Sequence, residues 1–231
     1  MDRTARQAGA KAARHSAYLV AAVALALAIT GASSDIPQLD GSTEPSASDA
    51  QAIRDYYTDG GYEADVASIA AKTETYLESA CEAPNAAIVI DVDDTTLLTY
   101  PLQEKTDFVI DRTLKARWVK YEKFPAVPGM VDLLDAASES GCRILAITGR
   151  PVAQTKPTIA NLVKVGYPSL ARFSARPVGD TRTVVQFKSA MRAKFARTYD
   201  IVANLGDQDS DLAGGKSGRK VKLPNPMYEI G

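Results

Sequence analysis

The sequence predicts an α/β domain built on a doubly wound parallel sheet. Residues 86–90 and 143–147 have the length and apolar character of strands that are covered on both faces. Segments in which apolar residues recur at helical spacing alternate with these strands. A β-α-β-α order of this kind favours a parallel sheet with helices on both sides.

The first segment of the chain differs from the rest. Basic residues precede an uncharged apolar run from Ala17 to Ile29, which is shorter than the roughly 20 residues that a membrane-spanning helix needs. A basic lead, a short apolar core and small residues behind it are typical of a secretory signal peptide. We expect a signal peptide over residues 1–32, cleaved after Ala32, with an uncleaved anchor as the alternative. The mature protein would then be secreted, without a stable membrane anchor.

Two helices are expected ahead of the first strand. Residues 33–47 are rich in Ser, Pro, Asp and Gly and predict a flexible leader, so the folded domain is expected over residues 48–231. Ser48 and Gln51 form a capping-box pattern that predicts a short helix to Tyr57. From Tyr62 the apolar positions follow helical spacing and predict an amphipathic helix.

The second half of the chain continues the alternation of helices and strands. A helix is expected at residues 129–139, followed by the strand at 143–147 and a helix at about 155–165. A short strand is expected near Phe173. Lys188 is expected to open a helix that ends at Arg197, ahead of a strand at residues 201–205.

The segment between the first strand and the helix at 129 permits two interpretations. Its aromatic residues either line a substrate pocket or pack a small helical cover. Too few residues separate Thr95 from Thr148 for a large cap domain. The aromatic residues concerned are Tyr100, Phe108, Trp118, Tyr121 and Phe124.

Cysteine usage and charge limit the compartment and the partners. Cys81 and Cys142 each precede a predicted strand, so both can lie at the same end of one sheet. An even cysteine count in an oxidising compartment favours a disulfide, with two buried free thiols as the alternative. The net charge of −1 provides no basic footprint, so no nucleic-acid partner is expected. The sequence makes no prediction of the oligomeric state.

Polar groups follow three of the predicted strands at the edge where α/β sheets bind ligands. Residues 91–95 (D-V-D-D-T), 148–150 (T-G-R) and 206–211 (G-D-Q-D-S-D) occupy these positions. Clustered carboxylates need a neutralising cation, and their hard oxygen atoms suit Mg²⁺. Hydroxyl and backbone N–H groups hold anionic oxygens, and a lysine offsets developing charge. Phosphoryl transfer requires this combination of positioning and charge neutralisation.

The sequence lacks the residues that several other hydrolytic mechanisms require. The only histidine, His15, lies in the predicted signal peptide, which excludes histidine nucleophiles and Ser-His hydrolases in the mature protein. Neither cysteine is followed by an arginine six positions on, so the cysteine-phosphatase loop is absent. A carboxylate remains the obvious covalent nucleophile.

Four short motifs in this order resemble the haloacid dehalogenase (HAD) superfamily of phosphohydrolases. They are D-V-D-D-T at 91–95, I-T-G-R at 147–150, F-K-S at 187–189 and G-D-Q-D-S-D at 206–211. Within the superfamily the chain is similar to the acid phosphatase branch, which contains class C bacterial acid phosphatases and plant vegetative storage proteins, over roughly residues 50–215. The resemblance implies a HAD-like (Rossmann-like) doubly wound sheet, here with a minimal helical cap.

The resemblance also implies roles for the matching residues. Asp91 would be the nucleophile that becomes an aspartyl-phosphate, and Asp93 would protonate the leaving alcohol and then activate water. Thr148 and the Gly149 amide would bind phosphate oxygens. Lys188 would also bind phosphate, and it would stabilise the negative charge on Asp91 and on the phosphate.

A cofactor follows from the same resemblance. Mg²⁺ would be held by the Asp91 carboxylate, the Asp93 backbone carbonyl, Asp207, and Asp211 either directly or through water.

Arg150 would contact substrate or brace its loop. Asp94 and Asp209 are expected to face solvent.

We therefore predict a secreted, Mg²⁺-dependent acid phosphatase that hydrolyses small-molecule phosphate monoesters, with a broad substrate range because little covers the site. The acidic optimum is consistent with Asp93 starting the cycle protonated. The alternatives are a 5′-nucleotidase or phosphotransferase of the same fold and a catalytically idle storage or binding protein. The intact Asp91 argues against an idle protein, because binding alone needs no nucleophile.

Overall fold

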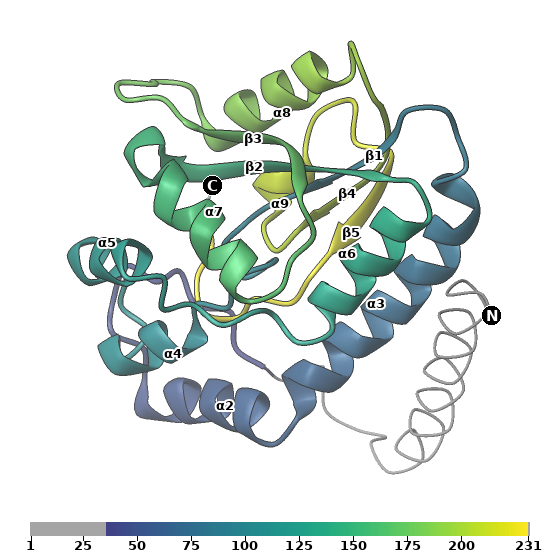
Figure 1. The fold of residues 1–231 in the computed structure, drawn as a ribbon. Coiled ribbons are helices and arrows are strands. Elements are labelled where there is room, and N and C mark those ends of the chain that lie inside the picture. The colour runs from purple at the N-terminus through teal and green to yellow at the C-terminus, as the bar shows by residue number, and fades with distance from the viewer. Residues whose placement is uncertain (1–35, 231) are drawn as a thin grey trace, which may run out of the picture. The chain divides into compact units, whose positions relative to one another are not determined.

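The computed structural model describes residues 36–230, which form one compact unit (Figure 1). The predicted signal peptide at 1–32 and the first residues of the predicted leader lie outside the described residues. None of the helices among the described residues combines the length and the apolar character needed to cross a membrane.

Five parallel strands form a single sheet in the order β3-β2-β1-β4-β5. The chain begins this sheet at its centre, winds to one edge and returns to build the other, which confirms the doubly wound α/β fold. Ile90 at the end of β1 pairs with Ala146 of β2 and with Leu205 of β4, so the carboxyl ends of these strands meet at one edge. The strands are β1 (Ala86–Ile90), β2 (Arg143–Pro151), β3 (Leu170–Arg176), β4 (Asp200–Gly206) and β5 (Arg219–Lys222).

Helices cover both faces of the sheet because successive strand side chains point to opposite sides. Ile88 and Ile90 belong to the larger core cluster, with helices α3 (Gly61–Ala80) and α6 (Met130–Glu139), which run side by side in Figure 1. Val89 faces the other way, against Phe187 and Phe195 of α8 (Val184–Phe195). Helix α7 (Thr155–Lys164) follows the short helix η2 (Val152–Gln154).

The helix α2 (Ala47–Thr58) begins earlier than predicted. The hydroxyl of Ser46 accepts a hydrogen bond from the Asp49 N–H (3.1 Å), so Ser46 caps the helix in place of Ser48. Residues 36–46 fall within the expected flexible leader, yet the structure places them against the domain. The Leu39 N–H donates to the Pro226 carbonyl, and the segment's apolar side chains join a third core cluster.

Helix α8 also begins earlier than predicted. Thr183 and Gln186 form a capping box, in which each side chain accepts a hydrogen bond from the other residue's backbone N–H. Lys188 therefore lies in the second turn of α8 rather than opening it. The edge strand β5 is a further element that the sequence analysis did not predict.

Between β1 and α6 the chain forms the small helical cover: α4 (Tyr100–Gln103), η1 (Glu104–Thr106) and α5 (Arg112–Lys120). Phe108 and Phe124 are fully buried, and Trp118 packs on Phe124 with ring centroids 5.4 Å apart. Tyr100 stacks on Tyr57 of α2 at 4.1 Å. These four aromatic residues therefore pack the cover, whereas Tyr121 is exposed.

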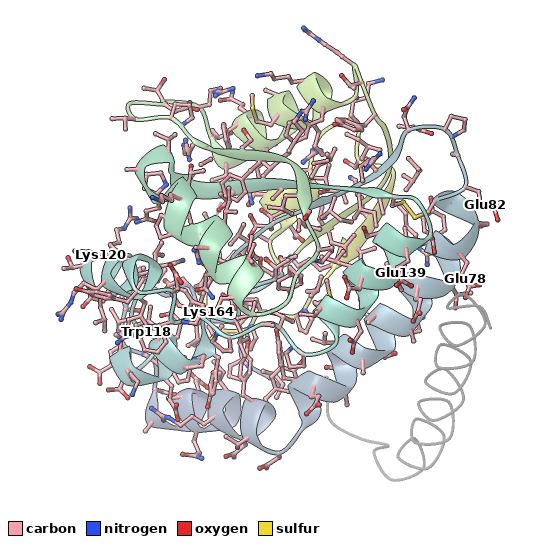
Figure 2. The ribbon with its side chains drawn as sticks, in the orientation of Figure 1. Glu78, Glu82, Trp118, Lys120, Glu139 and Lys164 are labelled. Carbon is pink, nitrogen blue, oxygen red and sulfur yellow. A yellow bond between two sulfur atoms is a disulfide. The ribbon has the colours of Figure 1, made fainter. Side chains whose placement is uncertain are left out.

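Cys81 and Cys142 form a disulfide, drawn as the yellow bond near Glu82 in Figure 2. The bond joins the end of α3 to the residue before β2, at the amino end of the sheet. The prediction of a disulfide is confirmed. The disulfide therefore lies at the end of the sheet opposite to the predicted site residues, which follow the carboxyl ends of the strands.

Candidate active site

Asp91, Lys188 and Asp211 come together from three different elements. Asp91 follows β1, and its N–H donates to the carbonyl of Leu205 in β4 (3.0 Å), which fixes the strand end. The Nζ of Lys188, on α8, donates to Asp91 Oδ1 (2.5 Å) and to Asp211 Oδ1, on α9 (Asp209–Leu212). All three side chains are buried.

A third carboxylate completes an acidic cluster. One oxygen from each of Asp91, Asp207 and Asp211 lies within 4.8 Å of the others. Lys188 offsets one of the three negative charges, which leaves two on buried groups when all are ionised. Isolated buried charges are costly, and a hard divalent cation takes carboxylate oxygens as ligands. The donor set and its charge therefore fit a hard divalent cation.

Asp207 is oriented by neutral donors on three sides. Its Oδ1 accepts from the Thr95 hydroxyl (3.0 Å), and its Oδ2 accepts from the amides of Gln208 (2.7 Å) and Asn225 (2.8 Å). Such outer hydrogen bonds fix the orientation of a metal-binding carboxylate. The sequence analysis missed Gln208 and Asn225, and for Gln208 its place inside the fourth motif was the available signal.

Asp211 is held through the backbone of its segment. Arg192 of α8 is fully buried and donates to three backbone carbonyls within residues 211–215. Asn204 of β4 donates to the Asp211 carbonyl as well (2.9 Å). Gly206 gives the side chain room, because a Cβ at this position would lie 2.4 Å from the Asp211 Cβ. Sequence reasoning identified neither Arg192 nor Asn204.

Asp93 lies in a separate ion-pair group beside the cluster. Arg150 Nη2 is 2.6 Å from Asp93 Oδ1, and Lys115 Nζ of α5 is 3.3 Å from Oδ2. Arg150 also donates to the Thr158 hydroxyl (3.0 Å), so it braces the loop. Burial raises the pKa of Asp93, but Arg150 and Lys115 outweigh burial and hold this pKa below its usual range. The sequence analysis assigned Asp93 no cationic partner and missed Lys115.

The charges of the central group are strongly perturbed. Burial raises the pKa of Asp91, Lys188 lowers it, and the neighbouring carboxylates raise it further. The net effect is a raised pKa. Burial and the charge of Asp211 raise the pKa of Asp207 as well. Burial lowers the pKa of Lys188, yet its contacts with Asp91 and Asp211 outweigh this and raise it, so the ammonium stays protonated.

Thr148 and Gly149 lie at the same edge, at the carboxyl end of β2. Ile90 pairs with Ala146, so Thr148 follows two residues beyond the last β1 partner. The buried Thr148 hydroxyl accepts from the Arg150 N–H (3.1 Å). Apart from Gly149 and its two chain neighbours, no heavy atom of the described residues lies within 4 Å of where a Gly149 Cβ would be, which leaves the backbone there open to approach.

The predictions that Asp94 and Asp209 face solvent have opposite outcomes. Asp209 is exposed and pairs with Lys222 (2.6 Å), as expected. The prediction that Asp94 faces solvent is wrong, because Asp94 is fully buried. Its carboxylate accepts from the N–H (2.7 Å) and hydroxyl (2.5 Å) of Thr99 and from the Tyr228 hydroxyl, and its φ of 54° closes the turn after β1.

Comparison with known proteins identifies the family of the chain. Residues 15–231 match the family model for HAD superfamily, subfamily IIIB (Acid phosphatase). The chain is similar to the stem 28 kDa glycoprotein of Glycine max, with 31% identity over 188 residues that cover 78% of this chain and 74% of the relative. It is also similar to acid phosphatase 1 of Solanum lycopersicum, with 29% identity over 186 residues, 77% of this chain and 73% of that protein.

A solved structure shares the fold. The class C acid phosphatase from Bacillus anthracis with tungstate bound superposes with a TM-score of 0.66 and 26% sequence identity. The match covers 76% of this chain and 82% of the bacterial one.

Proposed function

Because the chain belongs to subfamily IIIB of the HAD superfamily, the acid phosphatases, and is thus a phosphomonoesterase, we propose that it is a secreted, Mg²⁺-dependent enzyme that works through an aspartyl-phosphate on Asp91. The substrates are small-molecule phosphate monoesters. The observation that carries this proposal is the contact between Asp91 and Lys188 inside the buried cluster of three carboxylates.

Asp91 is the nucleophile. One of its carboxylate oxygens attacks phosphorus, and the bond between phosphorus and the leaving alcohol oxygen breaks. Lys188 opposes the effect of burial on the pKa of Asp91 and offsets the charge that the carboxylate and the phosphoryl group share. Thr148 and the Gly149 N–H bind phosphate oxygens from the neighbouring strand end.

Asp93 is the general acid and then the general base. It gives its proton to the leaving alcohol, and in the second step it takes a proton from the water that attacks the aspartyl-phosphate, which releases phosphate and restores Asp91. Arg150 and Lys115 lower the pKa of Asp93 in the free protein. The negative charge of a bound phosphate ester opposes this effect, and the need for a protonated Asp93 gives an acidic optimum.

Asp91, Asp207, Asp211 and the Asp93 carbonyl would hold Mg²⁺. The fit rests on the three buried carboxylates and the two charges that Lys188 leaves uncompensated. When bound, the ion neutralises charge on the cluster and on phosphate oxygens. Thr95, Gln208 and Asn225 fix Asp207 for this role.

Secretion is supported by features at two places in the chain. The basic and apolar pattern of residues 1–32 is that of a signal peptide. The disulfide between Cys81 and Cys142 is typical of proteins from oxidising compartments.

The test compares the mature protein with Asp91→Asn in hydrolysis of p-nitrophenyl phosphate, with Mg²⁺ and with a chelator. We expect Asp91→Asn, and the chelated wild type, to lose at least about 10³-fold in kcat, since the nucleophile and the charge neutralisation are removed. Asp209→Asn makes the same chemical change at an exposed carboxylate of the fourth motif and is the matched control. Equal turnover by Asp91→Asn would remove the mechanism, and a wild type without turnover would favour the idle storage protein.

A further inference from the structure

Asp93 has more positive charge around it than it can neutralise. Arg150 and Lys115 both lie within ion-pair distance of its carboxylate, so the group of three carries a net charge of +1 when Asp93 is ionised. The two cations differ in access: the Arg150 side chain is 3% exposed, and that of Lys115 is 23% exposed. The surplus charge is therefore presented to solvent by Lys115.

Lys115 comes from the helical cover rather than from the sheet edge. Helix α5 has the sequence R-T-L-K-A-R-W-V-K, with four basic residues and no acidic one. Within the described part of the chain, Asp93 is the one carboxylate in ion-pair distance of Lys115. The Lys115 ammonium also lies 5.9 Å from the centre of the Tyr228 ring. No acidic side chain on α5 itself competes for this charge.

The position of Lys115 relative to a substrate follows from the role of Asp93. A general acid lies within about 3 Å of the leaving oxygen, and the Lys115 ammonium is 3.3 Å from the Asp93 carboxylate. The ammonium is thus within roughly 7 Å of the leaving oxygen. A carboxylate on the carbon that bears this oxygen extends about 3 Å further, so one that is turned toward α5 comes into attractive range of the ammonium.

We propose that Lys115 is a specificity-determining residue that favours phosphate monoesters whose leaving alcohol carries a second anionic group close to the ester oxygen. This inference rests on the proposed function, since it places the leaving group beside Asp93. The anionic group is held by the cover helix, while the transferred phosphate is bound at the sheet edge. A neutral leaving group gains nothing from Lys115.

The test uses two substrates that differ in one charge, 2-phosphoglycerate and glycerol 2-phosphate. Wild type, Lys115→Met and Lys115→Arg are compared by the ratio of their kcat/KM values for the anionic and the neutral ester. The ratio cancels any change that Lys115→Met causes in Asp93 itself. Lys120→Met is the matched control, because Lys120 is an exposed lysine on the outer side of α5 (Figure 2).

We expect the ratio to fall about three- to tenfold in Lys115→Met, as for a partly exposed ion pair, and to be retained in Lys115→Arg and Lys120→Met. In the wild type the ratio should also fall as salt is raised from about 0.05 to about 0.5 M, because the attraction is screened. A ratio that changes less than about twofold in Lys115→Met, or that salt leaves unchanged in the wild type, overturns the inference. Absence of hydrolysis of both esters by the wild type would instead remove the proposed function.

Discussion

Replacing Arg192 by lysine should weaken metal binding although Arg192 contacts no carboxylate of the cluster. The guanidinium is fully buried and donates to three backbone carbonyls of residues 211–215, the segment that carries Asp211. Lysine keeps the charge but lacks the planar fork that serves several acceptors at once. We therefore expect the segment to lose its fixed position.

The magnitude follows from the lost hydrogen bonds. If the lysine side chain of the Arg192→Lys variant serves one carbonyl, two bonds from a charged donor are lost, each worth about 1.5–3 kcal/mol. The free energy of unfolding should fall by about 3–6 kcal/mol, a large part of the roughly 5–15 kcal/mol that is typical of a domain. Loss of an outer partner of a ligand typically weakens metal affinity about 10- to 100-fold.

Two measurements separate the effects. Urea unfolding of the metal-free protein gives the stability change, and calorimetric titration with Mg²⁺ gives the affinity. Lys194→Gln alters an exposed residue of the same helix and should change neither. If Arg192→Lys loses stability but binds Mg²⁺ within about twofold of the wild type, Arg192 supports the fold alone and the positioning argument fails.

Further predictions concern the metal-free protein and the disulfide. Burial and neighbouring carboxylates raise the pKa values of Asp91 and Asp207, so above about pH 4 the folded state binds more protons than the unfolded one, and stability falls as pH rises. The melting temperature without metal should therefore be lower at about pH 7.5 than at about pH 5, and saturating Mg²⁺ should remove most of the difference; a rise with pH in the metal-free protein would contradict the assignment. Removing the disulfide with Cys81→Ala and Cys142→Ala should cost about 4 kcal/mol in urea unfolding, because the bond closes a 61-residue separation. Turnover of the folded variant at 25 °C should be unchanged, and a large loss in kcat would show that the amino end of the sheet affects the site.

The central strands and their carboxylates were predictable because the signal is local. Apolar runs mark β1 and the first part of β2, and the acidic residues that follow β1 and β4 mark the binding edge. In β5 the pattern R-K-V-K buries only Val221, so an edge strand of this kind has no apolar run to reveal it. The sequence analysis consequently ended the sheet one strand early.

The errors at the site have a common physical origin. Asp94 has the sequence context of a solvated turn, and its burial depends in part on Tyr228, which is 134 residues away in sequence. Lys115 stands among other basic residues of α5, and nothing local separates it from the solvated ones. Asn225 follows the last strand and reaches Asp207 through the tertiary fold alone. Contacts between segments far apart in sequence leave no periodic pattern to read.

The dependence of Asp207 and Asp94 on Asn225 and Tyr228 also constrains when the protein becomes competent during synthesis. The strand ends at 91 and 148 emerge from the ribosome long before the segment that secures them, so an incomplete chain has its acidic residues without their final orientation. We therefore expect Asp207 and Asp94 to reach the orientation seen here only once residues 225–228 have packed against them, which makes the setting of these two carboxylates a late step in folding.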